Sequence, residues 1–137
     1  MPQRTVLEAK RLGIFSCLSN DNLEYAANRI AEEDISGMVV VDGQGFLAGV
    51  LTRIDLLRAF VNSPDWKKEP VSAYMSPHVI TVHPDTRLIE VAHMLLAHHV
   101  HRVVVVREEG NKQRPIGVIG DTDLVYNMMR EVSREDD

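Results

Sequence analysis

The sequence predicts an α/β (α+β) fold made of two tandem repeats, each with the order strand, helix, strand, strand, helix. Residues 14–41 and 79–106 align without a gap at an offset of 65, and the same apolar pattern runs through both. In each half a helical stripe is followed by a valine-rich run typical of a buried strand. The chain therefore divides into a first repeat at 1–69, with an N-terminal helix and the linker, and a second repeat at 70–137.

An amphipathic helix is predicted early in each repeat, because apolar residues recur there at helical spacing. The two stripes are Leu23, Ala26, Ala27, Ile30 and Ala31 in the first repeat and Leu88, Val91, Ala92, Leu95 and Leu96 in the second. Asp21 suits the N-cap of the first helix, with Glu24 as its partner three residues later. Thr86 takes the equivalent capping position in the second repeat.

Two strands are predicted to follow each helix. The first is a buried strand, at Met38–Val41 in one repeat and Val103–Val106 in the other. A glycine-rich turn then leads into a second strand at Phe46–Thr52, as in a hairpin. In the second repeat we expect a turn three residues longer, at 107–115, before a strand at 116–119.

The two repeats also end alike. Gly49–Leu56 aligns with Gly117–Leu124 at an offset of 68, and each octet leads into a short amphipathic helix, expected at Leu56–Val61 and Leu124–Arg130. The segment 63–70 holds two prolines and four charged residues and is predicted to be the connector. One repeat of about 60 residues buries too little apolar surface alone, so the two are expected to pack together.

Composition excludes several classes of function. Fifteen basic against twenty acidic side chains give a net charge of −5, which argues against non-specific nucleic-acid binding. The single Cys17 rules out an internal disulfide and cysteine metal clusters, and its apolar neighbours favour an inert core position. There is no apolar run of about 18 residues and no signal-peptide pattern, so we expect no membrane segment and a cytoplasmic protein.

Both closing octets follow the pattern Gly-hydrophobic-hydrophobic-Thr-x-x-Asp-Leu, with departures in the second, and Met75–Val82 resembles a characteristic opening segment. Together with the duplicated element order, these features resemble a stand-alone pair of CBS (cystathionine β-synthase) domains, from about Val6 to Glu131. The resemblance implies repeats packed about a pseudo-twofold axis that leaves two clefts. It also implies binding of adenine nucleotides, sometimes of S-adenosylmethionine, and pairing of two modules into a homodimer.

The Thr-x-x-Asp pattern has a physical logic for nucleotides. A carboxylate accepts hydrogen bonds from ribose hydroxyls, while a threonine hydroxyl and the N–H groups of a helix's first turn donate to phosphate. In the first repeat the resemblance assigns Asp55 to ribose, with Thr52 and Arg53 on phosphate. The alternative is ordinary helix capping by Thr52 and Asp55.

In the second repeat, Asp123 matches the ribose position, but Gly120 replaces threonine and Asp121 replaces arginine. An extra carboxylate there disfavours a polyphosphate, so this cleft is predicted to be the weaker one. The pair His101–Arg102 resembles the phosphate-contacting pair of nucleotide-sensing CBS proteins. The alternative is solvated surface charge.

The remaining candidate residues, Ser36 excepted, are assigned to the base. Ser16 and Thr81 occupy equivalent positions on the opening strands, where the family often contacts the base. Ser36 stands where the second repeat has His101. Four apolar residues are candidates for lining the base slots, although core packing explains them equally well: Ile35, Met38, Val100 and Val103.

All six histidines lie between His78 and His101, and Glu90 and His93 share a helix face, which raises a metal site as an alternative. Histidines near a helix C-terminus are also favoured by the helix dipole, and no cysteine or pattern of supporting partner residues accompanies them, so no metal site is assigned. No catalytic triad, paired carboxylates or phosphate-binding Gly-Lys-Ser/Thr loop is present, so no enzymatic activity is expected.

We therefore expect a regulatory module that requires no cofactor, binds AMP, ADP or ATP as ligand and transmits a shape change to an unidentified partner protein. The alternatives are a structural or dimerisation scaffold with degenerate clefts, and an S-adenosylmethionine-binding module.

Overall fold

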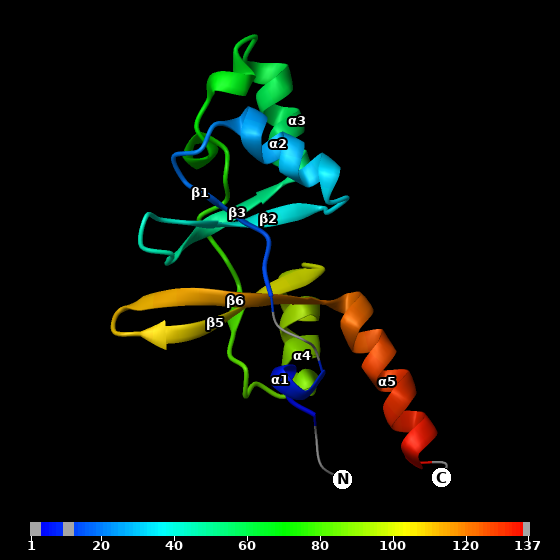
Figure 1. The fold of residues 1–137 in the computed structure, drawn as a ribbon. Coiled ribbons are helices and arrows are strands. Elements are labelled where there is room, and N and C mark those ends of the chain that lie inside the picture. Colours follow the sequence, from blue (N-terminus) through cyan, green and yellow to red (C-terminus); the bar gives the residue numbers. More distant parts are fainter. Residues whose placement is uncertain (1–3, 10–12, 136–137) are drawn as a thin grey trace. The chain divides into compact units, whose positions relative to one another are not determined.

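The computed structural model describes residues 4–9 and 13–135 of the chain, with side chains described as far as Arg130. The chain forms two compact units (Figure 1). One comprises Ile14–Val79 and Glu108–Pro115, which is the first repeat with the tip of a later hairpin. The other comprises the described parts of the N-terminal segment before Ile14, with Ile80–Arg107 and the C-terminal segment from Ile116.

The first repeat has the predicted order of elements. These are β1 (Ser16–Leu18), α2 (Leu23–Glu32), β2 (Gly37–Val41), β3 (Leu47–Thr52) and α3 (Arg53–Asn62). β2 lies between the other two strands, parallel to β1 and antiparallel to β3. β2 is buried from Met38 onward, as predicted for this valine-rich strand.

The predicted stripe of α2 is the face that packs, with Leu23, Ala26 and Ile30 buried in the core of the first repeat. Its predicted cap was wrong by one residue. The N-cap is Asn22, whose side chain accepts a hydrogen bond from the backbone N–H of Tyr25, while Asp21 accepts one from Leu18 N.

The second repeat contains β4 (Thr81–Val82), α4 (Leu88–His98), β5 (Arg102–Glu109), β6 (Lys112–Gly120) and α5 (Asp121–Glu135). Its sheet has the order β4-β5-β6, with β4 parallel to β5. Two expectations were wrong. Most of the expected long turn is strand, because β5 and β6 extend to a tight turn at Gly110, which has a positive φ of 64°. Thr86 does not cap α4, because its hydroxyl accepts a hydrogen bond from His83 N.

The tip of that long hairpin belongs with the first repeat by its contacts. The guanidinium of Arg114 lies 4.5 Å from the ring centroid of Phe46 and donates to the carbonyl oxygen of Gln44 at 3.1 Å. Arg114 also pairs with Glu109 across the hairpin. The three-residue insertion noticed in the sequence therefore makes ordered contacts instead of a longer loop.

A short helix lies before the first strand of each repeat, and each of these helices packs on the other repeat. α1 (Val6–Ala9) places Val6 in the core of the second repeat, where Val6 N donates to Thr86 O at 2.9 Å. The 3₁₀ helix η2 (Val71–Ala73) places Val71 in the core of the first repeat, where Val71 N donates to Asp21 O at 2.8 Å. α1 thus contacts the second repeat although it precedes the first in the sequence.

The connector between the repeats also packs on the first repeat. It contains the 3₁₀ helix η1 (Trp66–Lys68), and Trp66 packs against the core of the first repeat. Beyond the connector, Ser76 and Val50 of β3 exchange two backbone hydrogen bonds of 2.9 and 3.0 Å, which place Ser76 at the edge of that sheet. Among the described helices, none is long and apolar enough to cross a bilayer.

Candidate functional site

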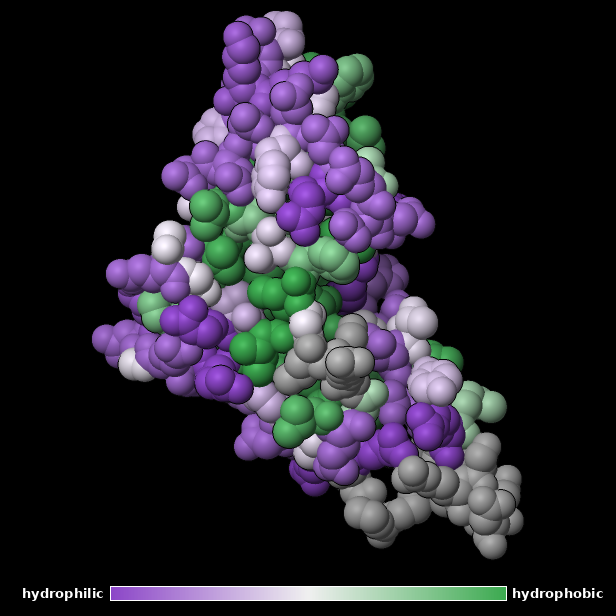
Figure 2. All heavy atoms as spheres, viewed as in Figure 1, coloured by the Kyte–Doolittle hydropathy of each residue, from purple (hydrophilic) through white to green (hydrophobic). Residues whose placement is uncertain are grey.

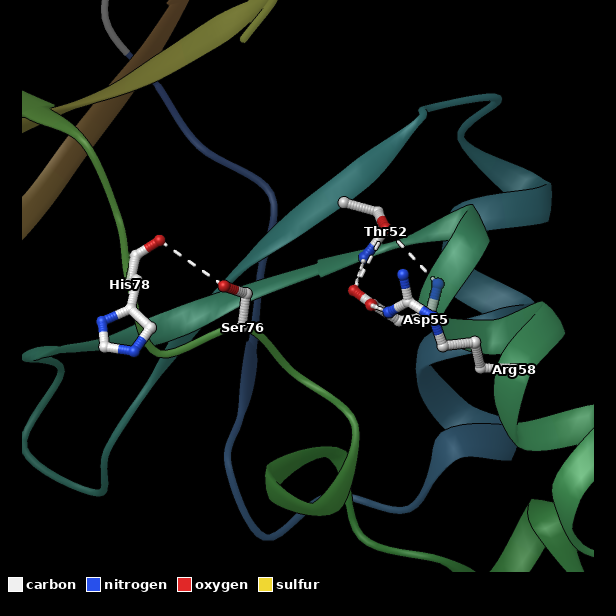
Figure 3. Close-up of polar contacts among 5 residues, drawn as sticks. All are labelled: Thr52, Asp55, Arg58, Ser76 and His78. Carbon is white, nitrogen blue, oxygen red and sulfur yellow. Dashed lines mark hydrogen bonds and ion pairs between the residues drawn. The ribbon is translucent and has the colours of Figure 1, made fainter. Parts of the chain in front are cut away.

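The start of α3 is organised by Thr52 and Asp55 (Figure 3). The backbone N–H and the hydroxyl of Thr52 donate to Oδ2 of Asp55 at 2.8 and 3.1 Å, and Asp55 N donates to the Thr52 hydroxyl at 3.4 Å. This reciprocal capping box starts α3 at Arg53, three residues before the predicted start. Helix capping by these two residues is therefore a fact of the fold, and it leaves Oδ1 of Asp55 for other contacts.

Asp55 is a buried charge, with 6% of its surface exposed. Its Oδ1 pairs with the guanidinium of Arg58 at 3.0 Å, one helical turn along α3. A buried carboxylate is costly unless hydrogen bonds or opposite charge surround it, and Thr52 and Arg58 supply both.

Ser36 lies beside this capping box. Its carbonyl oxygen accepts a hydrogen bond from Arg53 N at 3.1 Å, and the next residue, Gly37, pairs with Thr52 in the sheet. Among the residues that the structure describes, the buried Ser36 hydroxyl is without a hydrogen-bond partner. A buried hydroxyl without a hydrogen bond costs about 1–3 kcal/mol of stability. The Ser36 hydroxyl is therefore suited to form a hydrogen bond with a ligand that binds from outside the chain.

The other predicted residues of the first repeat are spread between surface and core. The Arg53 side chain is exposed and reaches Asp34 at 3.4 Å. Ser16 is half-buried on β1, Met38 is buried in the core, and Ile35 packs against that core. Core packing is sufficient to explain the burial of Met38.

The second repeat reproduces the backbone frame of the first. Gly120 N donates to Oδ2 of Asp123 at 2.9 Å, as Thr52 N does to Asp55. Asp121 N donates to the carbonyl oxygen of His101 at 2.9 Å, as Arg53 N does to that of Ser36. The two aspartates therefore hold equivalent positions at the starts of α5 and α3.

The side chains around that frame differ. His101 Nδ1 lies 2.9 Å from Oδ2 of Asp121, and this imidazole, together with the N–H of Thr122, holds the pKa of the Asp121 carboxyl below its usual range. Arg102 is exposed and its stem lies over Gly120, where a Cβ would come within 2.8 Å of Arg102 Cγ. Glycine at position 120 thus leaves room for the stem of Arg102.

Three further predicted residues of the second repeat lie on or near its sheet. Thr81 is half-buried on β4, where it pairs with Val104. Val103 is buried in the core, and Val100 packs against it. As in the first repeat, core packing accounts for the buried valine.

The duplicated architecture and the paired aspartates are matched by a known family. The family model of the CBS domain matches residues 9–62 and again residues 71–130. The chain belongs to the CBS domain family. It is a tandem pair of CBS repeats, and the fold class predicted from the sequence is confirmed.

Relatives of this CBS pair occur in proteins of different lengths. An inosine-5′-monophosphate dehydrogenase of Nitrosopumilus maritimus is 29% identical over 128 residues, which is 89% of this chain and 25% of that protein. The CBS domain-containing protein YhcV of Bacillus subtilis is 27% identical over 115 residues, covering 83% of this chain and 78% of the relative. The chain thus spans only a quarter of the dehydrogenase.

Solved structures with the same fold include a putative acetoin utilization protein (AcuB) of Vibrio cholerae. It has a TM-score of 0.84 and 23% identity, covering 98% of this chain and 97% of that one. CBSX2 in complex with AMP has a TM-score of 0.79 and 24% identity, covering 92% and 96%. The CBS pair of protein MJ0100, in complex with 5′-methylthioadenosine and S-adenosylmethionine, has a TM-score of 0.79 and 23% identity, covering 95% and 99%. At these identities the likeness establishes the fold alone.

Sequence reasoning missed one polar residue of the first CBS repeat. Arg58 follows Asp55 by three residues, a spacing that places two side chains together on a helix. This spacing can be read from the sequence, but the burial of Asp55, which strengthens the ion pair, depends on tertiary packing.

The histidines do not assemble a metal centre within the described part of the CBS pair. Across residues 4–9 and 13–130, no three histidine, cysteine, aspartate or glutamate side chains come together in a way that would hold an ion. Cys17 is buried on β1, and burial, with a contribution from Asp21, raises the pKa of its thiol to about 11.

Proposed function

We propose that this CBS pair is a regulatory module that binds an adenine nucleotide and passes the resulting conformational change to a partner protein. The observation that carries the proposal is the buried, unpartnered hydroxyl of Ser36 beside the Thr52–Asp55 capping box. No enzymatic step is assigned to the chain.

The chemistry of this corner suits a nucleoside phosphate. Oδ1 of Asp55 is an acceptor for ribose hydroxyls, because Oδ2 is already engaged by Thr52. The Ser36 hydroxyl is a donor or acceptor that gains a partner on binding. Arg53 and Arg58 add positive charge at the same end of α3, which favours a phosphate over an uncharged substituent.

The ligands of related structures are consistent with this class. CBSX2 was solved with AMP, and the CBS pair of MJ0100 with 5′-methylthioadenosine and S-adenosylmethionine. We propose AMP, ADP or ATP for the first repeat. The second repeat is the weaker candidate for these ligands, because the carboxylate of Asp121, beside His101, disfavours a polyphosphate; S-adenosylmethionine is the alternative ligand.

Calorimetric titration with AMP, ADP, ATP and S-adenosylmethionine tests the proposal. A ligand present at about 100 times its dissociation constant adds about 2.7 kcal/mol to stability, so a thermal shift accompanies binding. Asp55→Asn, which keeps the shape of the side chain and removes its charge, is expected to abolish nucleotide binding at the first repeat. Asp123→Asn is expected to have a smaller effect. Failure of all four ligands to bind would contradict the proposal, and equal losses from both variants would contradict the ranking of the two sites.

A second copy of the chain is the proposed structural partner. α3 and α5 expose apolar side chains at the same aligned positions: Leu57, Phe60 and Val61 in the first repeat, and Val125, Met128 and Met129 in the second, each between 56% and 79% exposed. Green surface is visible over α3 and, separately, over α5 (Figure 2). A face repeated in both halves of one chain suits a homodimer, because a symmetric partner presents the same two faces.

Sedimentation velocity with Leu57→Glu and Val125→Glu tests this dimer. Both positions lie on exposed helix faces, so folding is expected to survive while the charge blocks association. Glu24→Lys, on the exposed face of α2, is the matched control. A wild-type chain that stays monomeric at high micromolar concentration would contradict the dimer.

A further inference from the structure

We propose that Arg58 is a specificity-determining residue that makes the first repeat prefer phosphorylated nucleosides to uncharged ones. A ribose of either kind breaks the ion pair between Arg58 and Asp55, but only a phosphorylated ligand offers Arg58 a new ion pair. This inference rests on the proposed nucleotide-binding function. It starts from one contact, in which the Arg58 guanidinium donates to Oδ1 of Asp55 at 3.0 Å (Figure 3).

The acceptor capacity of Asp55 is limited. A carboxylate offers about four lone-pair positions. The backbone and hydroxyl of Thr52 take two on Oδ2, and Arg58 takes one on Oδ1. A ribose that donates both hydroxyls to Asp55 therefore displaces Arg58, whereas a single hydroxyl does not have to.

Displacing Arg58 from Asp55 has a cost because the carboxylate that loses its partner is buried. The Asp55 side chain is 8% exposed and that of Arg58 is 64% exposed. The hydrogen bond from Arg58 to this buried carboxylate is stronger than a surface ion pair, and the water that the exposed guanidinium regains on leaving offsets only part of its loss. An uncharged nucleoside gives nothing back for the broken pair. A 5′-phosphate is attached to the same ribose, and the flexible arginine stem can turn towards it and form a new ion pair.

The second repeat lacks this arrangement. The residue aligned with Arg58 is Tyr126, whose ring has the guanidinium of Arg130 at 5.5 Å from its centroid. The discrimination proposed for Arg58 is therefore specific to the first repeat. At the start of α4, the N-cap residue Arg87 forms an ion pair of 3.0 Å with Glu90 at the same three-residue spacing, but both side chains are about half exposed.

The test measures the dissociation constants of adenosine and AMP by calorimetry. The background is Asp123→Asn, which weakens the second repeat so that the first dominates the signal. Into it we introduce Arg58→Gln, which keeps a donor for Asp55 and removes the charge, and separately Arg58→Lys, which keeps the charge. Arg87→Gln is the matched control, since it breaks an ion pair of the same length away from Asp55.

Arg58→Gln is expected to raise adenosine affinity about three- to tenfold and to leave AMP affinity equal or lower, so that the preference for AMP narrows at least fivefold. Arg58→Lys is expected to retain most of the preference, and Arg87→Gln all of it. A purely structural role would weaken both ligands together and leave their ratio unchanged.

The outcomes separate this inference from the function on which it rests. If AMP fails to bind the Asp123→Asn chain while Arg58 is intact, the proposed function of the first repeat fails, and this inference fails with it. If AMP binds and Arg58→Gln leaves the ratio within twofold, or lowers adenosine affinity, the inference alone is overturned. An equal change in Arg87→Gln overturns it as well, because the effect would then be independent of Asp55.

Discussion

Val6 and Val71 are aligned residues of the two repeats, and each is fully buried in the core of the other repeat. The backbone contacts agree, since a bridge joins Thr5 to Arg87 and the aligned bridge joins Pro70 to Asn22. Each repeat is thus completed by a short helix that the alignment assigns to the other repeat. Neither repeat has its full core without a segment from elsewhere in the chain.

Truncation of these two valines is expected to act on opposite halves. Val6→Ala is predicted to lower the free energy of unfolding by about 1.5–3 kcal/mol and to increase hydrogen exchange mainly in the second repeat. Val71→Ala is predicted to do the same in the first repeat. Urea unfolding with residue-resolved hydrogen exchange checks both, with the exposed Leu7→Ala as control. Enhanced exchange of the first repeat in Val6→Ala would contradict the reciprocal packing.

A side chain at position 120 is predicted to collide with Arg102. A Cβ there would lie 2.8 Å from Arg102 Cγ and 3.0 Å from the carbonyl oxygen of His101. Gly120→Ala is expected to destabilise the fold by about 1–3 kcal/mol, and less in an Arg102→Ala background, where the first of these contacts is gone. Gly43→Ala, which meets nothing within 4 Å, is the control for thermal and urea unfolding. Equal losses with and without Arg102 would show that the arginine is not the cause.

Arg102 is expected to act on phosphate and not on the nucleoside. Its exposed guanidinium offers a planar fork of donors, so Arg102→Ala is predicted to weaken AMP about fivefold or more and adenosine little. Calorimetry with the two ligands measures the difference. Arg107→Ala, which removes another exposed arginine of β5, is the control. A uniform loss for both ligands would remove the proposed phosphate contact.

Cys17 is predicted to be nearly unreactive in the folded chain. Its raised pKa, about 11, keeps the thiol protonated at neutral pH, and its burial keeps reagents away. Reaction with an aromatic disulfide reagent is expected to be slow in buffer and fast in denaturant, with Cys17→Ser as the blank. Similar rates in both conditions would contradict the buried position.

Asp42 is expected to stabilise the folded chain at neutral pH and to lose this contribution in acid. Backbone N–H groups of Phe46 and Gln44 donate to its carboxylate, which lowers its pKa below the ordinary value of 3.8. Because the folded-state pKa is the lower one, this stabilisation is present above about pH 4 and is lost as the pH falls through the folded-state pKa.

Melting temperatures between pH 6 and pH 3 check this expectation. Asp42→Asn is predicted to melt lower than the wild type at pH 6 and to converge with it in acid. Asp65→Asn is the control, since that side chain makes no capping hydrogen bond. A constant difference across the range would contradict the assignment.

Local pattern was enough to identify the duplicated strand–helix–strand–strand–helix order, the buried faces of α2 and α4, and the core position of Cys17. Periodicity reports which face of an element is buried, and a gapless offset of 65 reports the duplication. The aligned positions of Asp55 and Asp123 followed from the same offset arithmetic.

Packing decided what those faces are buried against. Nothing in the segment containing Val6 indicates that it completes the distant second repeat, because hydrophobicity has no direction. The N-cap of α2 is Asn22 and not the predicted Asp21, because a cap depends on the backbone geometry at a single residue, which the sequence pattern does not specify. Tertiary structure likewise decided that the Asp55 end of the Asp55–Arg58 ion pair is buried, and that the stem of Arg102 lies over Gly120. Both relationships depend on side chains that come together only when the sheet and its helix have formed.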